Sequence, residues 1–546
     1  MKMEEGLSRS LSLIIHVLLC MRHVSAGSDL AGQAINQLKY ETSSSSPDWG
    51  TLESSTISSS TSCEETHLYA NKNWEEVEDY TSVDIAIIGA GPAGLATAIG
   101  LSRSLPADSA VKIRIYERAP EIRKASQGML SLWPNGISSL ARIHPDLPRL
   151  MKSEGCPMER TVIASIDGAT GSESIILDTG SENISRGIND MPFATLIRWQ
   201  AMHAVLAKLL LDDNDGEAMV VTGHSLLTYK EVEGADKDDA VFLRFENGNI
   251  VRAKIVIGAD GTFSSVRKTM HPSDRPIYFG QMNWNAIVPT DTLPEDARPP
   301  INGVKMISYD GDGDSDSNKD SVRWSVYIND CGANHTFFQL RITDMEKAKA
   351  LSGSKGRGGL GLPGVKAALL PVVKMSTHTS NVLNALPDEL IFERAIIGRL
   401  PASTWLSPGG RVVLLGDCAH AMHPLLGQGA NQAFGSTAAL VEGITSSYKN
   451  HVDEGKNNDD LSWLVNGLES YDRNRRPRMD WFHRYVNMAG CGQSSGEATS
   501  RPELDQQTKA LWSKWFKTED HVPPPLEGRH LVETFDPLSI LEVSLV

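Results

Sequence analysis

Three short apolar runs, each followed directly by a glycine, are the clearest hydrophobic pattern in the chain. They cover residues 83–88 (VDIAII), 250–257 (IVRAKIVI) and 411–415 (RVVLL). Apolar runs of this length, rich in β-branched residues, are typical of buried strands in a parallel sheet. A helix over Leu95–Ser104 and another strand over Val111–Tyr116 are expected between the first two runs. The pattern therefore predicts an α/β fold.

Alternating polar and apolar residues mark a second region, between the second and third runs. Residues 321–327 (SVRWSVY) and Thr336–Ile342 alternate in this way. Alternation with a period of two predicts antiparallel strands that cover a core on one face only. We expect this region to form a separate antiparallel sheet. The glycines of Gly356–Gly361 follow no apolar run and are interpreted as a loop.

The segment GAGPAG at residues 89–94 lies between the first strand and the first helix. In such a segment Gly89 permits a tight turn, Gly91 lets the backbone approach a pyrophosphate, and Gly94 lets the helix pack against the strand. The start of the helix offers free N–H groups to phosphates. This order of strand, glycines, helix and strand predicts a dinucleotide site.

The acidic residue that ends the second strand indicates which nucleotide is bound. Glu117 can accept hydrogen bonds from an adenosine ribose, which favours FAD or NAD over a nucleotide with a 2′-phosphate, although Arg118 follows it. No second unit of this kind occurs in the sequence. The residues expected to contact the nucleotide are Gly89, Gly91, Pro92, Ala93, Gly94, Glu117 and Arg118.

Two further motifs follow the other apolar runs. Residues 258–267 read GADGTFSSVR, and residues 416–429 read GDCAHAMHPLLGQG. With the nucleotide glycines, these DG and GD motifs occur in the order and at roughly the separations found in one family. From about Val83 to Arg478 the chain resembles the class A flavoprotein monooxygenases, the superfamily of salicylate hydroxylase, kynurenine monooxygenase and zeaxanthin epoxidase.

The resemblance implies a bound FAD and assigns roles to individual residues. Asp417 would hold the ribityl chain, Asp260 would lie near the pyrophosphate, and Pro424 would face the flavin ring. Gly427, Gln428 and Gly429 would place a helix start beside the flavin pyrimidine, and Arg198 would contact the flavin region. NAD(P)H would be a transient co-substrate, and O₂ and a small aromatic or isoprenoid molecule would react. No catalytic side chain is assigned, because the chemistry belongs to the flavin.

The resemblance also implies an architecture: a Rossmann-like FAD-binding domain, an inserted antiparallel-sheet substrate domain and a C-terminal helical segment. The expected divisions are a signal peptide (1–26), a Ser-rich disordered linker (27–80), the FAD-binding domain (81–277 and 400–445), the substrate domain (278–399) and a helical region with a tail (446–546).

The chain departs from the family pattern at two places. Gly435-Ser436 stands where the family usually has Glu-Asp, and Asn285-Ala286 precedes Ile287 where an arginine is frequent. Because of the first departure, a protein that binds FAD but does not catalyse turnover is kept as an alternative function. A flavin halogenase is disfavoured, because residues 284–289 (WNAIVP) keep only the first Trp and the Pro of the expected run.

Other polar clusters receive structural interpretations. His420 and His423 have the spacing of a metal pair but no evident third ligand, so we interpret them as pocket or packing residues and expect no metal site. Asp310–Asp320 is interpreted as a solvated loop. The basic run Arg473–Arg478 is interpreted as a surface face of a helix rather than an anion site.

Composition excludes several other classes of protein. The 546 residues include 52 Lys and Arg against 68 Asp and Glu, a net charge of −16. Such an acidic chain is a poor ligand for nucleic acids. The six cysteines lie far apart and form no CxxC pair, which disfavours a zinc ribbon or a disulfide scaffold.

The first residues have the form of a secretory signal. Lys2 and Arg9 precede an apolar run, Leu11–Met21, which is followed by the small residues Ser25 and Ala26. The run is too short to span a bilayer, so we expect no transmembrane span in the mature chain. Entry into the secretory route is favoured over an amphipathic extension. Because the cofactors are those of internal pools, we expect an internal compartment or plastid rather than the extracellular space.

Overall fold

The computed structural model describes residues 79–106, 111–122, 127–168, 170–180, 194–213, 219–232, 239–309, 322–354, 358–456 and 460–494. The predicted signal peptide, nearly all of the predicted linker, the acidic loop Asp310–Asp320 and the end of the chain after residue 494 lie outside these residues.

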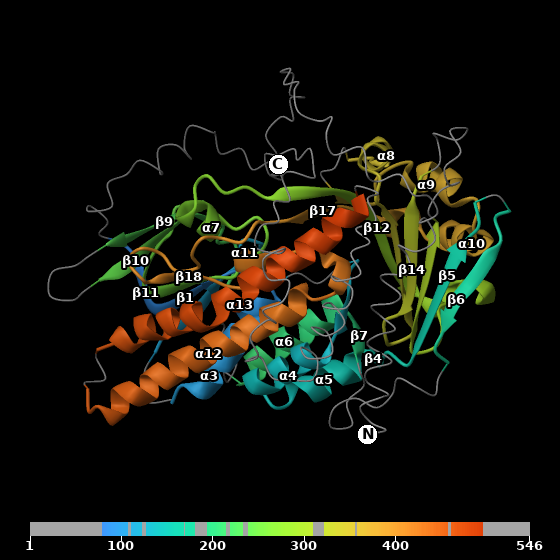
Figure 1. Ribbon diagram of the computed structural model, residues 1–546. Helices are drawn as coiled ribbons and strands as arrows, with labels where there is room; N and C mark the ends of the chain where they lie inside the picture. The colour runs from blue at the N-terminus through green and yellow to red at the C-terminus, as the bar shows by residue number, and fades with distance from the viewer. Residues whose placement is uncertain are drawn as a thin grey trace, which may run out of the picture.

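A seven-stranded sheet forms the centre of the first part of the molecule (Figure 1). The strands β8, β2, β1, β11 and β18 run parallel, and β10 and β9 continue the sheet antiparallel beyond β11. All three glycine-terminated apolar runs are strands of this sheet, as expected. Their bounds are β1 (Thr81–Ile88), β2 (Ile113–Tyr116), β8 (Val220–Val221), β9 (Leu226–Val232), β10 (Ala240–Phe245), β11 (Ile250–Gly258) and β18 (Val412–Leu414).

Helices bury the sheet on its faces and share one large hydrophobic core with it. The long helix α12 contacts α13, α4 and α3, and Figure 1 shows α12 and α13 lying alongside one another across the sheet. The helices of this part are α3 (Pro92–Ser104), α4 (Pro134–Ile143), α5 (Leu147–Glu154), α6 (Trp199–Asp213), α7 (Ser265–Met270), α11 (Asp417–His420), α12 (Gly429–Asp453) and α13 (Ser462–Ser494), with the 3₁₀ turn η9 (Pro424–Leu426). The expected C-terminal helical segment is therefore present.

An eight-stranded sheet forms the second part, with strand order β16-β17-β12-β15-β14-β13-β5-β6. All of its pairs are antiparallel except β13 with β5. Its strands are β5 (Arg160–Ile166), β6 (Glu173–Asp178), β12 (Ile277–Pro289), β13 (Gly303–Tyr309), β14 (Trp324–Asp330), β15 (His335–Ile342), β16 (Gly359–Leu360) and β17 (Phe392–Gly398). The alternating segments predicted as antiparallel strands are thus β14 and β15. Residues 359–360, within the predicted loop Gly356–Gly361, instead form the short strand β16.

Two strands of this sheet come from an unexpected part of the chain. β5 and β6 lie inside residues 81–277, yet β5 pairs with β13 of the second sheet. A three-stranded sheet of β3 (Met129–Leu132), β7 (Thr195–Arg198) and β4 (Cys156–Pro157) lies next to β5 in the chain. The chain therefore crosses between the two parts more often than the expected divisions imply.

The two faces of the eight-stranded sheet differ in chemistry. One face carries Trp284, Leu340 and Val326 in register, and it packs with α8 (Met345–Leu351), α9 (Val365–Val373) and α10 (Thr377–Ala385). The 3₁₀ turns η6 (Thr290–Thr292), η7 (Glu295–Ala297) and η8 (Asp388–Leu390) connect these elements. Because side chains alternate along a strand, the residues between them face the other way, toward the seven-stranded part.

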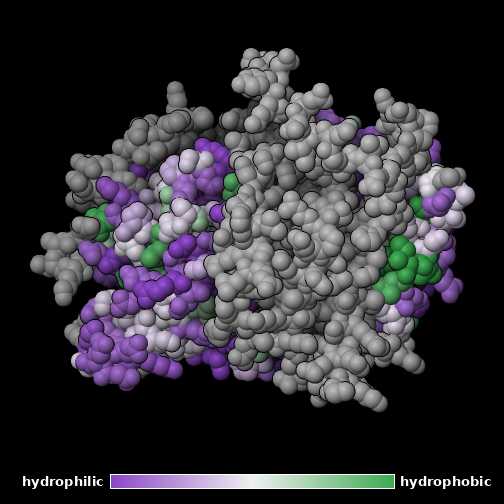
Figure 2. Space-filling model, in the orientation of Figure 1, coloured by the Kyte–Doolittle hydropathy of each residue, from purple (hydrophilic) through white to green (hydrophobic). Residues whose placement is uncertain are grey.

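The outer margin of the second sheet is apolar. Figure 2 shows hydrophobic side chains gathered on this side of the molecule, and the edge strand β6 exposes Ile175 and Ile176 by 63% and 44%. Within the described part of the chain, no helix is both long and apolar enough to cross a membrane.

A buried carboxylate ties a loop to this sheet. Glu393 of β17 is fully buried and accepts hydrogen bonds from Trp284 Nε1 (3.1 Å), Ser352 Oγ (2.5 Å), Gly353 N (2.9 Å) and both the backbone N (3.2 Å) and the hydroxyl of Ser354. The carboxylate thus satisfies buried donors from β12 and from the loop after α8.

We predict that Glu393→Ala lowers the free energy of unfolding by about 2 kcal/mol or more, because several buried N–H and O–H groups lose their acceptor. Urea denaturation of the purified chain measures this change. The exposed Glu389→Ala serves as the matched control and is expected to change the free energy by less than about 0.5 kcal/mol. Equal effects of the two substitutions contradict the anchoring role.

Candidate active site

The glycine segment after β1 leaves space for a ligand at the start of α3. Gly89 has a φ of +104°, and a Cβ there would lie 2.6 Å from the carbonyl oxygen of Ala259. Gly91 is the N-cap of α3, Pro92 occupies its first turn, and nothing lies within 4 Å of the position of a Gly91 Cβ. A Cβ on Gly94 would overlap the Gly89 carbonyl. The loop is therefore folded tightly while its Gly91 side stays open, as a phosphate-binding turn requires.

Glu117 supports this loop as well as facing the expected ribose position. Its carboxylate accepts hydrogen bonds from the backbone N of Ala90 (2.8 Å) and of Ala119 (3.0 Å). Each carboxylate oxygen keeps a further lone pair for a ligand hydroxyl. Arg118 is exposed and makes no contact with another described side chain. The loop-bracing role of Glu117 was not expected from the sequence.

The DG and GD motifs meet at a buried arginine. Arg267, the last residue of the DG motif, is 1% exposed and donates from Nη1 to the carbonyls of Cys418 (3.1 Å) and Ala419 (2.8 Å). Its Nη2 donates to Leu400 O at 2.7 Å, and its Nε pairs with Asp274. The sequence analysis assigned no role to Arg267, although it is the last residue of the DG motif.

Asp260 accepts hydrogen bonds from the first turn of α7, a short helix that begins inside the DG motif. Its Oδ2 accepts hydrogen bonds from the backbone N of Ser265 (2.7 Å) and Val266 (3.2 Å), while its Oδ1 is buried and has no hydrogen-bond partner. Burial raises the pKa of the Asp260 carboxyl, and the hydrogen bonds it accepts oppose that rise.

Asp417 begins α11 at the end of β18. Its side chain is accessible to water, although the surrounding protein raises the pKa of its carboxyl, chiefly by burial, with the Arg394 charge opposing the rise. Pro424 and Gly427 are likewise accessible. Asp417, Pro424 and Gly427 are thus open to a ligand, and the role of Asp417 toward the ribityl chain stays a prediction.

The GQG turn is held by the side chain of Asn431, which also contacts the segment before α4. Gly427 has a φ of +60°, and Gln428 precedes the first residue of α12, Gly429. Asn431 Oδ1 accepts from Trp133 N (2.9 Å), and Asn431 Nδ2 donates to Gly427 O (2.8 Å). Nothing lies within 4 Å of a Cβ placed on Gly429. The turn is fixed in shape, and the start of α12 has open space beside it.

Four buried polar atoms in these segments lack a hydrogen-bond partner. They are Asp260 Oδ1, Asn135 Oδ1, Gln428 Nε2 and Arg198 Nε. Buried polar atoms are nearly always paired, so each of these four atoms is a candidate contact for a polar ligand. Donors and acceptors are both present, and they come from the DG motif, the start of α4, the GQG turn and the end of β7. This donor and acceptor set, with the open glycine loop, fits FAD.

Three interpretations of individual residues can be compared with the structure. His420 Nε2 lies 2.9 Å from Ser436 Oγ, and His423 Nε2 lies 3.2 Å from Gln281 Oε1. In the described ranges, no group of three or more His, Cys, Asp or Glu residues could hold a metal ion. The surface interpretation of the basic run is wrong for Arg475, which is 3% exposed and donates to Gln432 Oε1 at 2.9 Å. The helix α13 turns that residue toward α12, whereas Arg473 stays exposed.

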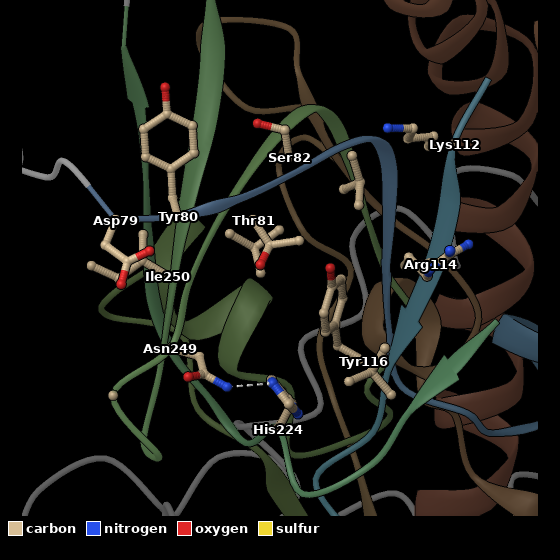
Figure 3. Close-up of a pocket in the computed structure, with 14 residues that line it drawn as sticks. Asp79, Tyr80, Thr81, Ser82, Lys112, Arg114, Tyr116, His224, Asn249 and Ile250 are labelled. Carbon is tan, nitrogen blue, oxygen red and sulfur yellow. Dashed lines mark hydrogen bonds between the residues drawn. The ribbon is translucent and has the colours of Figure 1, made fainter. Parts of the chain in front are cut away.

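A cavity of about 440 Å³ lies along the strands β1, β2, β8 and β11, and its lining includes Tyr116 and Val221, the last residues of β2 and β8. Thr81, Lys112 and Ile250, at or near the amino ends of β1, β2 and β11, line it, and Figure 3 shows Asn249 hydrogen-bonded to His224 at its base. The glycine loop and both aspartates lie at the carboxyl ends of these strands, where ligands bind in open α/β sheets. The cavity thus reaches the residue before Glu117 but does not include the glycine loop or the two aspartates.

The chain was compared with protein-family models, curated proteins and solved structures. No protein-family model matches the chain. The chloroplastic zeaxanthin epoxidase of Spinacia oleracea is 23% identical over 410 residues, which cover 74% of this chain and 53% of that protein. The structure of Klebsiella pneumoniae HpxO with FAD and uric acid matches with a TM-score of 0.53 and 21% identity, over 85% of this chain and 98% of HpxO.

A further structure, CtdE in complex with FAD and its substrate 4, matches with a TM-score of 0.58 and 15% identity, over 84% of this chain and 96% of CtdE. The chain is therefore similar in sequence to chloroplastic zeaxanthin epoxidases and similar in fold to structures of FAD-bound proteins. The solved structures confirm the predicted fold. The match spans about half the length of the spinach relative.

We predict a marked loss of stability in mild acid. Burial lowers the pKa of His420 and His423 well below the usual 6.5 and that of His483 to about 3. As the pH falls below about 6.5, the unfolded chain takes up protons at these residues while the folded chain does not. Each such histidine lowers the free energy of unfolding by up to about 1.4 kcal/mol per pH unit.

Melting temperatures at pH 7.5 and pH 5.5 measure this effect. The variant His483→Gln is expected to shrink the difference between the two temperatures, because one of the three proton-uptake sites is lost. A difference as large in the variant as in the natural chain contradicts the assignment for His483.

Proposed function

We propose that the protein is an FAD-dependent monooxygenase that uses NAD(P)H and O₂ to hydroxylate or epoxidise a small organic molecule. The observation that carries the proposal is the open glycine loop at the start of α3, which lies against the DG motif at Ala259 and against the GD motif at Gly416. The loop, the DG motif, the GD motif and the GQG turn border the same region, in the order known from the related monooxygenases.

Each segment has one task in this proposal. Gly91 and the start of α3 bind the pyrophosphate, and Glu117 holds the adenosine ribose. Asp417 accepts hydrogen bonds from the ribityl hydroxyls. The start of α12 at Gly429 lies beside the flavin pyrimidine, where its N–H groups stabilise negative charge. Pro424 and Arg198 border the ring.

A bound FAD would supply the redox chemistry, namely hydride acceptance from NAD(P)H and activation of O₂. The protein itself positions the reactants and excludes water from them. His423 packs edge-to-face on Phe279 and contacts Gln281 of β12, so the segment before Pro424 adjoins the second sheet. The substrate is proposed to bind between that sheet and the flavin.

Two alternative functions are a protein that binds FAD without turnover and a flavin halogenase. An FAD-binding protein without turnover is suggested by Ser436, which stands where the family usually has an aspartate. A flavin halogenase is disfavoured further, because Trp284 faces the helices α8–α10 and donates to Glu393 rather than facing the flavin region. We also propose the domain boundaries given above, and entry into the secretory route through a signal peptide at residues 1–26.

The proposal predicts that the purified chain has a flavin absorption spectrum that bleaches on addition of NADPH without oxygen and recovers in air. Stopped-flow or simple visible spectroscopy measures both steps, and NADH is compared in parallel. If neither NADPH nor NADH bleaches the flavin bands, even with candidate substrates present, the FAD-binding protein without turnover is favoured. A chain that stays colourless after incubation with FAD contradicts the proposal.

Asp417→Ala is expected to weaken FAD binding at least tenfold. A charge-assisted hydrogen bond contributes about 1.5–3 kcal/mol, which corresponds to roughly tenfold to a hundredfold in Kd. Fluorescence titration of the apoprotein with FAD measures Kd. The exposed Asp388→Ala is the matched control. Unchanged FAD affinity in Asp417→Ala removes Asp417 from the site.

A further inference from the structure

One side of the cavity along β1, β2, β8 and β11 is cationic. Lys112 directly precedes β2 and Arg114 lies within it, and both residues line the cavity (Figure 3). Ile113 and Ile115, which alternate with them, are buried in the core. Because side chains alternate along a strand, Lys112, Arg114 and Tyr116 share the opposite face, and the Cα atoms of the two cations are about 7 Å apart. The strand thus presents a row of three polar side chains to the cavity.

Lys112 has no counter-ion in the described part of the chain. Its ammonium group forms no hydrogen bond or ion pair there, whereas Arg114 donates from Nη1 to the carbonyl oxygen of Ile113 at 3.0 Å. The carboxylate of Asp84 accepts a hydrogen bond from the backbone N of Lys112 (2.8 Å). Among the described lining residues Asp79 is the one carboxylate, and Figure 3 shows it on the side of the cavity away from Lys112 and Arg114. In a chain with a net charge of −16, this local excess of positive charge favours a bound anion.

The Tyr116 hydroxyl is the third polar group of the row. The residue is 3% exposed, and its ring packs against His224 and Phe245, with ring centres 5.6 Å and 5.1 Å away. The hydroxyl makes no hydrogen bond to a described residue. Burial raises the pKa of Tyr116 to about 12, and the Arg114 charge opposes the rise, so the hydroxyl stays protonated at neutral pH. It can therefore donate a hydrogen bond to an oxyanion beside Arg114.

The cavity has room for more than a simple oxyanion. Its volume of about 440 Å³ lies within the range of small-molecule sites, roughly 300–1,000 Å³. Tyr80, which is 41% exposed, lines the side opposite the cations, and its ring makes an edge contact with Phe242 at 5.5 Å. A tyrosine ring supplies a large apolar contact area for a flat group. The cavity therefore combines a cationic side with an aromatic one.

We propose that this cavity is a binding site for a phosphate monoester that carries a ring. Lys112 and Arg114 bind the phosphate, the Tyr116 hydroxyl donates a further hydrogen bond to it, and Tyr80 contacts the ring. A phosphate monoester carries nearly two negative charges at pH 7, so it matches a pair of cations better than the single charge of a carboxylate does. This site goes beyond the proposed function and does not depend on it.

The cavity and the candidate FAD site are neighbours with separate residues. None of the described lining residues is among those assigned to FAD. The two sites share the strand β2, because the carbonyl oxygen of Tyr116 accepts a hydrogen bond from Gly89 N (2.8 Å) and Glu117 follows it. A phosphate bound at the glycine loop must therefore be distinguished from one bound in the cavity.

The test uses the full-length chain saturated with FAD, so that the glycine loop is occupied. The probes are phenyl phosphate and adenosine 5′-monophosphate, each compared with its neutral counterpart, phenol or adenosine. Isothermal titration calorimetry at constant ionic strength measures Kd. At least one of the two phosphates is expected to bind tenfold or more tightly than its neutral counterpart. The inference is overturned if neither phosphate binds, or if each binds no more tightly than its counterpart.

Variants locate the bound phosphate. Lys112→Gln and Arg114→Gln are each expected to weaken phosphate binding tenfold or more, and Tyr116→Phe is expected to weaken it by about threefold, the effect of one neutral hydrogen bond. FAD affinity is expected to stay within about twofold in Lys112→Gln, because that side chain lies outside the FAD site. The exposed Lys152→Gln on α5 is the matched control. Phosphate binding that both Lys112→Gln and Arg114→Gln leave unchanged places the ligand elsewhere and overturns the inference.

The inference and the proposed function can fail separately. A chain that binds FAD but shows no phosphate binding sensitive to Lys112→Gln contradicts the inference alone. A chain that does not bind FAD contradicts the proposed function, and the effect of Lys112→Gln on phosphate binding by the FAD-free chain then decides the inference.

Discussion

The candidate site depends on one buried charge cluster, formed by Arg267, Asp274 and Arg399. Arg267 and Arg399 both pair with Asp274, and Arg399 also donates to Thr262 O at 2.8 Å. Through its carbonyl contacts, Arg267 joins the DG motif to Cys418 and Ala419, 151 and 152 residues later in the chain. Among side chains, only a guanidinium has enough fixed N–H donors to bind three carbonyls and a carboxylate at once. A lysine could not hold these loops together.

The same cluster positions the second sheet relative to the first. Arg399 directly follows β17, so its contacts fix one end of the eight-stranded sheet on the DG loop. Asn487 of α13 donates to Arg399 O (3.0 Å) and accepts from His423 N (3.0 Å). The end of β17, the segment before Pro424 and the last described helix therefore share one small group of hydrogen bonds. Burial lowers the pKa of Arg399, and Asp274 opposes that shift. Because charges of both signs are buried together, their attraction offsets part of the free-energy cost of desolvating each of them.

Local patterns predicted the nucleotide half of the molecule well, because its elements are set by neighbouring residues. The strand β1, the GAGPAG turn and α3 follow one another within 24 residues. Features that depend on contacts between distant segments could not be predicted. The pairing of β5 with β13, the burial of Arg475 and the bracing of Ala90 by Glu117 all require knowing which segments meet. The alternation in β14 and β15 predicted strands and two faces, but it did not indicate which face meets the flavin region.

The substitution of the family's aspartate by Ser436 is consistent with an intact fold. Ser436 is fully buried on α12, two turns after Gly429, with its hydroxyl 2.9 Å from His420 Nε2 and 3.3 Å from Arg475 Nε. A hydroxyl can donate and accept at the same time, so it serves a neutral imidazole and a guanidinium together. Burial, reinforced by the Arg475 charge, keeps the pKa of His420 low and its ring neutral. Arg475 also donates to the carbonyl oxygen and side chain of Gln432, so its contacts do not depend on Ser436 alone. The substitution therefore alters packing between α11, α12 and α13, while Asp417 and the GQG turn keep their own contacts.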